Sequence, residues 1–314
     1  MKVLLTGATG FIGSYIMKEF LGAGHEIVGY DNVMDHTSIQ MLFSPEELAE
    51  IPLVQGDVRD LAGLIRVCQD YQIDTIVHQA GLLGAADRNY LEAAKVNIIG
   101  TLNVFEAARI LKLRRVVWAS SQTIFGPQVM HEEEWIPNDG MPHPWDNYSS
   151  IKTYLEFAGK AYAQKFGVDN IALRYCIVYG MGRMGRHGAY PSQLMVNPAM
   201  GIKGVVDYGD DAPNWLYVED AARATLLACT VPYTKSKAFT ITGEIMPMKE
   251  LKDYIMTLLP EAEIELKPGH YGCGWKFDGS AARDELGYEP YFSAKEGARK
   301  TINDVRKQCG LPPV

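Results

Sequence analysis

The chain has 314 residues, of which 47% are hydrophobic and 22% charged, and its formal net charge at pH 7 is −8. This length and hydrophobic content suffice for a large core in one big domain or two modest ones. The acidic balance argues against a nucleic-acid groove or a surface for anionic membranes. The five cysteines are scattered and form no C-x-x-C pair, so we expect no disulfide framework and no zinc or other metal site.

No apolar run in the sequence is long enough to cross a bilayer. The chain enters a predicted strand within its first residues, without the pattern of a secretory signal peptide. We therefore expect a cytoplasmic protein whose partner is a small-molecule substrate, with no nucleic acid and no membrane bound.

A glycine-rich turn joins the first predicted strand, over 2–5, to a predicted helix over 11–21. The order of strand, G-x-x-G-x-x-G and helix predicts a dinucleotide site. Gly7 allows the sharp turn, Gly10 lets a pyrophosphate approach the backbone, and Gly13 lets the helix pack closely on the strand. The start of the helix offers free N–H groups and a partial positive charge to the phosphates.

An acidic residue closes the second predicted strand, over 26–30, about twenty residues after the glycines. The carboxylate of Asp31 would accept hydrogen bonds from the adenosine ribose hydroxyls and would repel a 2′-phosphate, which favours NAD over NADP. The plainer alternative is an aspartate that only starts a turn with Asn32.

Further predicted strands at 53–58, 75–81 and 115–121 alternate with helical patterns, which is typical of β-α-β units in a parallel sheet. Ligands of such sheets bind at the carboxyl ends of the strands. Asp57 could accept there from the adenine amino group, or it could cap the next helix. The residues at these ends that we expect beside the cofactor are Asp57, Val58 and Ala80.

A tyrosine and a lysine four residues apart open a predicted helix that runs to about residue 166. Tyr148 and Lys152 would lie on one face, where the ammonium lowers the pKa of the phenol and makes it usable as a general base. Lys152 could also hold the nicotinamide ribose hydroxyls. Ser121, just past a strand end, could orient the reacting oxygen toward Tyr148.

These motifs together resemble the extended short-chain dehydrogenase/reductases, the NAD-dependent epimerase/dehydratase family. The resemblance covers nearly the whole chain and continues with Leu173-Arg174-Tyr175 and with the segments 215–224, 278–282 and 285–290. It implies an α/β fold, a Rossmann-type doubly wound parallel sheet with a smaller C-terminal substrate-binding lobe. The implied division is an NAD-binding domain over 1–170 to which 171–180 and 214–242 return, and an interleaved substrate-binding lobe over 181–213 and 243–314.

The resemblance also implies roles for individual residues. The catalytic residues would be Ser121, Tyr148 and Lys152. The NAD site would be formed by Gly7, Gly10, Phe11, Ile12, Gly13, Asp31, Asn32, Asp57, Val58, Ala80, Asn97, Tyr148, Lys152 and Tyr175. The substrate would contact Ser121, Thr123, Arg183 and Arg186. We also expect a homodimer, because an apolar band on the predicted helix after residue 148 suits either core packing or an interface shared with a predicted helix over 97–112.

Two departures from the family concern the substrate. Nucleotide-sugar members carry an Asn and an Arg that contact the sugar diphosphate, at the positions of Ile177 and Pro213 in this sequence. Neither side chain supplies a donor or a cation. Arg183, Arg186, His187 and Lys203 could replace them, or could be ordinary surface charge.

Gln122 stands where the dehydratase branch has an acid, and an amide cannot serve as a general acid or base, so dehydration is disfavoured. The sequence favours an NAD-dependent oxidoreductase that takes hydride from a secondary hydroxyl of a small polyhydroxy substrate, with Tyr148 as general base. That substrate would be a sugar, a sugar acid or a hydroxy amino acid. Two alternatives stay open: a nucleotide-sugar epimerase with a transient 4-keto intermediate, and a non-catalytic NAD(H) sensor.

Overall fold

The computed structural model describes residues 1–34, 37–83, 88–183 and 190–314. Seven parallel strands form the main sheet in the order β10-β6-β5-β4-β1-β2-β3. Their bounds are β1 (Lys2–Thr6), β2 (Glu26–Asp31), β3 (Leu53–Gln55), β4 (Thr75–His78), β5 (Arg115–Ser121), β6 (Asn170–Tyr175) and β10 (Ala238–Ile241). The predicted Rossmann-type sheet is confirmed.

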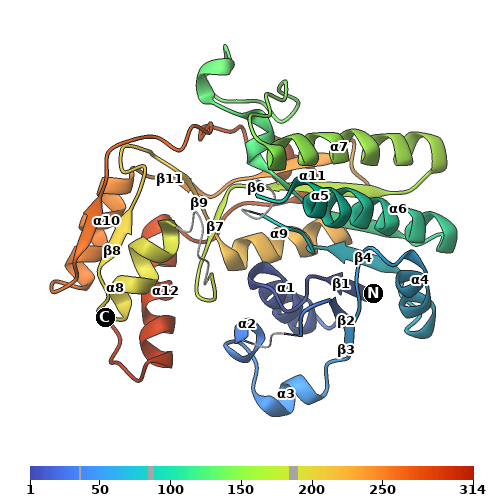
Figure 1. The fold of residues 1–314 in the computed structure, drawn as a ribbon, viewed down its shortest axis with the longest axis horizontal. Coiled ribbons are helices and arrows are strands. Elements are labelled where there is room, and N and C mark those ends of the chain that lie inside the picture. The colour runs from blue at the N-terminus through green and yellow to red at the C-terminus, as the bar shows by residue number, and fades with distance from the viewer. Residues whose placement is uncertain (35–36, 84–87, 184–189) are drawn as a thin grey trace.

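Helices cover both faces of this sheet, as Figure 1 shows. The side chains of a strand point alternately to the two sides, so Leu4 packs with one helical layer while Val3 and Leu5 pack with the other. The first layer contains α4 (Leu61–Asp70), α6 (Gly100–Leu111) and α7 (Asn147–Phe166); the second contains α1 (Phe11–Gly22) and α9 (Val218–Thr230). Burial on both faces explains why the strands read as continuous apolar runs.

The helix that carries Tyr148 has well-defined ends. Asp146 caps α7, because its Oδ1 accepts from the Ser149 N–H at 2.7 Å and the Ser149 hydroxyl oxygen accepts from the Asp146 N–H at 3.1 Å. Gly167, with a φ of 69°, ends the helix. A left-handed residue is the usual end of a helix and favours glycine. The capping box places Tyr148 in the first turn, beside the end of β5.

A smaller lobe follows at the C-terminal side. It contains the sheet β11-β9-β7 and the pair β12-β8. The bounds are β7 (Ile177–Tyr179), β8 (Gly204–Val206), β9 (Asn214–Tyr217), β11 (Glu244–Ile245), β12 (Ile264–Leu266), α8 (Asn197–Ala199), α10 (Met248–Leu258), α11 (Ser280–Leu286) and α12 (Ala294–Gln308). The segments 171–180 and 214–242 are thus shared, since β6, α9 and β10 join the large sheet whereas β7 and β9 pair with each other.

Short helical turns connect these elements. They are α2 (Thr37–Gln40), α3 (Pro45–Ala49), α5 (Tyr90–Ala93), π-helical turns at Ala94–Ile99 and Ser192–Val196, and 3-10 turns at Gln122–Phe125 and Gln128–Met130. None of the helices in the described part of the chain has the length and apolar character needed to span a membrane.

Candidate active site

The glycine-rich turn packs directly on the exit of β4. Gly7 has a φ of +70°, and a Cβ added to it would lie 2.7 Å from the backbone nitrogen of Ala80. A Cβ on Gly13 would collide with the Gly7 carbonyl oxygen. Gly10 is the N-cap of α1 and supplies no side-chain cap to the first turn. The first N–H groups of α1 therefore have no side-chain acceptor and can receive a phosphate.

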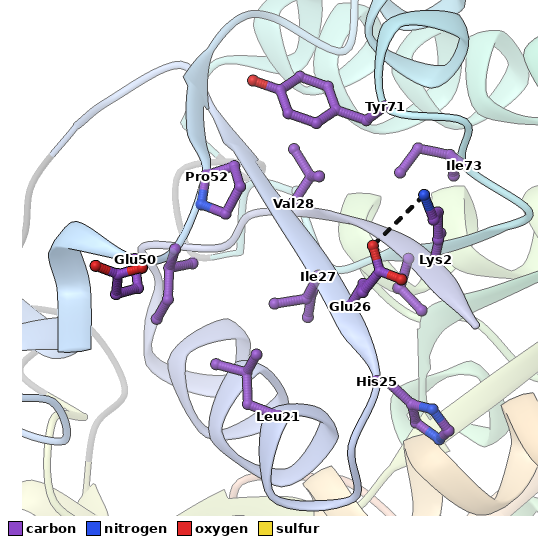
Figure 2. Close-up of a pocket in the computed structure, with 12 residues that line it drawn as sticks. Lys2, Leu21, His25, Glu26, Ile27, Val28, Glu50, Pro52, Tyr71 and Ile73 are labelled. Carbon is purple, nitrogen blue, oxygen red and sulfur yellow. Dashed lines mark ion pairs between the residues drawn. The ribbon is translucent and has the colours of Figure 1, made fainter.

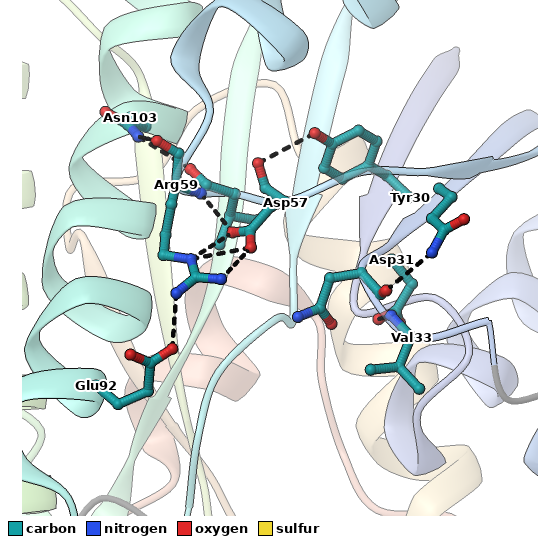
Figure 3. A network of polar contacts seen from close by, with 10 residues as sticks. Tyr30, Asp31, Val33, Asp57, Arg59, Glu92 and Asn103 are labelled. Carbon is teal, nitrogen blue, oxygen red and sulfur yellow. Dashed lines mark hydrogen bonds and ion pairs between the residues drawn. The ribbon is translucent and has the colours of Figure 1, made fainter.

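Asp31 at the end of β2 uses its two carboxylate oxygens differently. Oδ2 accepts from the Thr9 N–H at 3.0 Å and from the Thr9 hydroxyl at 2.9 Å. Oδ1 has a longer contact, from the Val33 N–H at 3.4 Å. Figure 3 shows this end of β2 with Asp31 and Val33 labelled. Oδ1 is the oxygen that can accept a ribose hydroxyl, and the exposed Asn32 follows it.

Asp57 after β3 is engaged by Arg59, as Figure 3 shows. Arg59 donates to it from the backbone at 2.8 Å and from the guanidinium at 2.5 to 3.0 Å, and also donates to Glu92 at 2.7 Å. The guanidinium lowers the pKa of Asp57. The helix cap that we considered for Asp57 belongs to Asp60, whose Oδ1 accepts from the Gly63 N–H at 3.0 Å.

The other residues predicted for the cofactor differ in how they are held. Val58 is buried beneath Gly100. Asn97 is also buried, and its side-chain amide binds both backbone groups of Leu82. It accepts from the Leu82 N–H at 2.7 Å and donates to the Leu82 carbonyl at 2.9 Å. The Tyr175 hydroxyl lies 2.7 Å from Thr225 Oγ1. Asn97 and Tyr175 thus already have protein partners, and Asn97 shapes the chain that leaves β4.

The structure brings four of the predicted catalytic and substrate residues together. The Ser121 hydroxyl lies close enough to Tyr148 to lower the pKa of its phenol, against the effect of burial. Ser121 Oγ accepts from the Thr123 N–H at 3.2 Å and from the Thr123 hydroxyl at 2.9 Å. Lys152 lies one turn further along α7, with Nζ 5.6 Å from the centre of the Tyr148 ring. Since both hydrogen bonds from Thr123 end on Ser121 Oγ, the hydroxyl proton of Ser121 is left to point toward Tyr148 or a bound oxygen.

The charges around Tyr148 differ from those expected. Burial raises the pKa of the phenol well above its usual value, with Asp146 and Tyr271 acting in the same direction, and the charge that opposes them is the guanidinium of Arg183. Burial also lowers the pKa of Lys152 to about 8, and its Nζ donates to the Ala119 carbonyl at 2.6 Å. In the chain without cofactor, burial outweighs the nearby charges and keeps the pKa of the Tyr148 phenol above its usual value.

Arg183 lies after β7, near enough to Tyr148 to act on it electrostatically. Its guanidinium donates to the Val178 carbonyl and interacts electrostatically with Tyr148, Tyr190 and Tyr271. No carboxylate within the described ranges forms an ion pair with it, and burial lowers its pKa. The candidates Arg186 and His187 lie outside the described residues. Lys203 forms an ion pair with Glu265 at 2.8 Å, and both side chains are about half exposed.

An aromatic cluster, not fully anticipated from the sequence, adjoins Arg183. The rings of Tyr271 and Trp145 meet edge to face at 5.6 Å, and Tyr208 contacts Tyr271 at 5.4 Å. Asp211 fixes this loop, because it accepts from the Tyr271 N–H at 2.8 Å and lies 2.9 Å from Nδ1 of His270. The sequence feature that could have predicted this cluster is an apolar and aromatic segment near the C-terminus. The cluster brings residues of the smaller lobe to the start of α7.

Sequence reasoning also missed two buried polar groups. His78, at the end of β4, lies between the hydroxyls of Thr6 at 2.7 Å and Thr101 at 2.9 Å, and burial lowers its pKa to about 3. Glu156, one turn beyond Lys152, pairs with Arg174 at 2.6 Å. The i, i+4 spacing from Lys152 was the signal that could have drawn attention to Glu156.

A separate cavity of about 320 Å³ lies at the opposite edge of the sheet, as Figure 2 shows. Apolar side chains such as Ile27, Val28 and Ile73 line it, and Lys2 pairs with Glu26 across it at 3.5 Å. It adjoins the amino end of β1, away from the residues of the catalytic group. In the ranges that the structure describes, no cluster of three or more His, Cys, Asp or Glu side chains is placed to hold a metal ion.

Comparisons with known proteins identify the family of the chain. A family model described as "NAD dependent epimerase/dehydratase family" matches residues 3–241. The UDP-glucose 4-epimerase of Mycolicibacterium smegmatis is 27% identical, with 98% of this chain and 99% of that protein covered. Crystalline UDP-glucose 4-epimerase from Thermotoga maritima has a TM-score of 0.86 at 23% identity over 98% of this chain and 100% of that one. A partial-consensus L-threonine 3-dehydrogenase has a TM-score of 0.85 at 22% identity, with 98% and 100% covered. The two structural likenesses show the fold alone.

Proposed function

Because the chain belongs to the NAD-dependent epimerase/dehydratase family, we propose that it moves a hydride between a secondary alcohol carbon of its substrate and NAD. The observation that carries the proposal is the group of Thr123, Ser121 and Tyr148 beside Lys152, in which Thr123 donates twice to Ser121 Oγ and the Ser121 hydroxyl lowers the pKa of Tyr148. A sensor that only bound NAD(H) would need no such proton-transfer group. The sensor alternative is therefore the weakest.

The carboxyl edge of the sheet fits the cofactor. The turn of Gly7, Gly10 and Gly13 leaves the first N–H groups of α1 open to the pyrophosphate. Oδ1 of Asp31 would accept from the adenosine ribose. Asp57, held by Arg59, would receive the adenine amino group. The further residues that we propose for this site are Phe11, Ile12, Asn32, Val58, Ala80, Asn97, Lys152 and Tyr175.

The protein would prepare the alcohol for oxidation in three ways. Tyr148 takes the hydroxyl proton, Ser121 holds the reacting oxygen, and Thr123 fixes the direction of the Ser121 hydroxyl. Bound NAD supplies the hydride acceptor and, when oxidised, a second positive charge. The positive charge opposes the burial that raises the pKa of Tyr148, as Arg183 does.

Two kinds of substrate fit, with different support. The relative from Mycolicibacterium smegmatis and the similar structure from Thermotoga maritima are both UDP-glucose 4-epimerases, which favours epimerisation of a nucleotide sugar through a transient ketone. Ile177 and Pro213 stand where those enzymes would be expected to hold a diphosphate, and they favour dehydrogenation of a small hydroxylated substrate. We place epimerisation first and dehydrogenation second.

Arg183 restricts the chemical class of substrate in both candidate reactions. Its guanidinium interacts electrostatically with Tyr148, so an acidic group that it bound would lie in the neighbourhood of the reacting carbon. A sugar acid meets this requirement in either reaction, as does a hydroxy amino acid in the second. Arg186 belongs to the same proposal as a second basic side chain.

A homodimer in the cytoplasm completes the proposal. Exposed apolar side chains lie on α6 and α7, among them Phe157, which is 71% exposed, and Tyr154, which is 45% exposed. A pair of apolar helices on one surface suits an interface between two copies of the chain.

The test is a screen of purified protein with NAD+ against UDP- and GDP-sugars, uronic acids, free sugars and threonine. Products would be separated by chromatography while NADH is followed by absorbance. A nucleotide sugar converted to its epimer without net NADH establishes the first candidate. Steady NADH accumulation with a small substrate establishes the second. NADH binding without conversion of any compound would favour the non-catalytic sensor over both enzymatic candidates.

A further inference from the structure

The catalytic helix is fastened to the end of β5 by side chains four residues apart. The three contacts are Tyr148 with Ser121, Lys152 with Ala119, and Glu156 with Ser120. Positions spaced by four lie on one face of a helix. The first two contacts belong to the site already described. The third comes from a residue that no part of the proposed chemistry uses.

The carboxylate of Glu156 is fixed from two sides. Oε1 accepts from the Ser120 hydroxyl at 2.5 Å and from Nε of Arg174 at 2.8 Å, and Oε2 accepts from Nη2 of Arg174 at 2.6 Å. The two side chains of the ion pair are 13% and 9% exposed. Ser120 and Arg174 are register partners on β5 and β6. An ion pair that is so little exposed and is joined by two hydrogen bonds keeps both side chains in one conformation.

Lys152 is the other cation near this carboxylate. No carboxylate among the residues with described positions forms a direct ion pair with it, and Glu156 is the negative group that raises its pKa against burial. From β4 it is faced by His78, which stays neutral because its pKa is about 3, and from its own helix by the Tyr148 phenol. Arg174 and Lys152 thus depend on one carboxylate.

We propose that Glu156 is a positioning residue, which keeps the Lys152 ammonium charged and in place beside Tyr148 while Arg174 and Ser120 hold the carboxylate still. It touches neither substrate nor cofactor. The inference rests on the proposed function only in taking Lys152 as a ligand of the nicotinamide ribose and as the charge partner of Tyr148.

The test follows NADH binding by fluorescence titration of the full chain from about pH 6 to about pH 10, a range that brackets the ordinary values of the groups involved. Wild-type affinity is expected to fall as Lys152 loses its proton near pH 8. In Glu156→Gln the fall moves to lower pH by about one unit or more, since a neighbouring opposite charge is gone. Lys152→Met should show no such step.

Asp169 provides the matched control. Its carboxylate is also shared by two cations, accepting from Arg115 at 2.7 Å and from Lys237 at 3.0 Å, but it lies at the opposite end of β6. Asp169→Asn should lower the melting temperature and leave the midpoint of NADH binding where it is in the wild type. A merely structural role for Glu156 would give the same pattern in Glu156→Gln.

Arg174→Gln gives an independent reading if Glu156→Gln fails to fold. Removing the competing cation leaves the carboxylate to Lys152, so the midpoint should rise. Each of three results would overturn the proposal. The pH midpoint of NADH binding could be unchanged in Glu156→Gln or lowered in Arg174→Gln, or the fall of affinity near that midpoint could persist in Lys152→Met. NADH binding needs no substrate, so a failure of the proposed hydride transfer would be seen separately in the activity screen.

Discussion

Asp31 accepts two hydrogen bonds from Thr9 with one carboxylate oxygen, Oδ2. One comes from the backbone N–H of Thr9 and the other from its hydroxyl. The acid that closes β2 therefore also holds the glycine-rich turn in shape. Its second oxygen, Oδ1, has only a longer contact with the Val33 N–H at 3.4 Å, and it is the oxygen that we propose for the adenosine ribose.

Asp31→Asn should weaken NADH binding by about tenfold, because a charge-assisted hydrogen bond contributes roughly 1.5–3 kcal/mol and an amide retains part of it. It should weaken NADPH binding less, or strengthen it, because the repulsion of the 2′-phosphate is gone. Fluorescence titration with both cofactors measures the ratio. Asp60→Asn, which alters the cap of α4 and an exposed ion pair with Arg66, is the control. If the ratio of NADH to NADPH affinity in the variant equals that of the wild type, Asp31 does not contact the adenosine ribose.

Tyr148→Phe removes the proposed general base and is expected to lower kcat by about 100-fold or more, as loss of general acid–base catalysis does. NADH affinity should change little. Tyr154→Phe on the same helix is the control, since Tyr154 is 45% exposed. Turnover that survives in Tyr148→Phe would contradict the catalytic assignment.

Thr123→Val tests how Ser121 is oriented. The variant keeps the backbone donor at 3.2 Å and loses the hydroxyl donor at 2.9 Å. We expect kcat to fall about fivefold, corresponding to a hydrogen bond of ~1 kcal/mol, with NADH affinity unchanged. Thr123→Ser should recover most of the loss. Equal rates in Thr123→Val and the wild type would show that the hydroxyl does not orient Ser121.

His78 should make the protein sensitive to acid. Its pKa is about 3 in the folded chain and about 6.5 when unfolded, so between these values the unfolded state binds more protons. The free energy of unfolding must therefore fall as the pH drops through this window. Between pH 7 and about pH 4 the fall due to His78 is roughly 3 kcal/mol.

His78→Gln lacks this titration. Urea unfolding of the variant and the wild type at both pH values isolates the contribution of the ring, because the carboxylates act alike in the two proteins. The gap between the two stabilities should narrow or reverse in acid. A gap that stays constant would mean that His78 is protonated in the folded chain.

Phe157→Glu should dissociate the proposed homodimer, since a charge placed in an apolar interface loses its hydration. Sedimentation velocity at micromolar protein would show a monomer. Val129→Glu is the control, because Val129 is 89% exposed and lies on a different segment. A wild type that already sediments as a monomer would contradict the expected homodimer.

Local patterns allowed most of the frame to be predicted. The turn of Gly7, the strand end at Asp31 and the helix that presents Tyr148 all depend on neighbours in the sequence, and each is found where it was predicted. The helix expected from Asn97 begins earlier, with α5 and a π-helical turn. The helical segment starts at Asn89, which caps α5 by accepting from the Glu92 N–H at 3.1 Å.

The electrostatics could not be predicted in the same way. Burial of Tyr148 and the approach of Arg183 depend on where β7 runs relative to α7, which no local pattern records. The pairing of β9 with β7 was also missed, because such short strands give little periodicity. Long-range packing decides these features.

The contact of α1 with α9 has a consequence for synthesis on the ribosome. Phe20 of α1 is fully buried in the layer that also contains Ala221 and Ala224 of α9. Arg115 of β5 donates to the carbonyls of Ala228 and Val231 at the end of α9. A nascent chain that has emerged only to residue 170 would hold most of the sheet, with α1 but not α9 covering one of its faces. The domain of the large sheet is complete only after the first strands of the smaller lobe have been made.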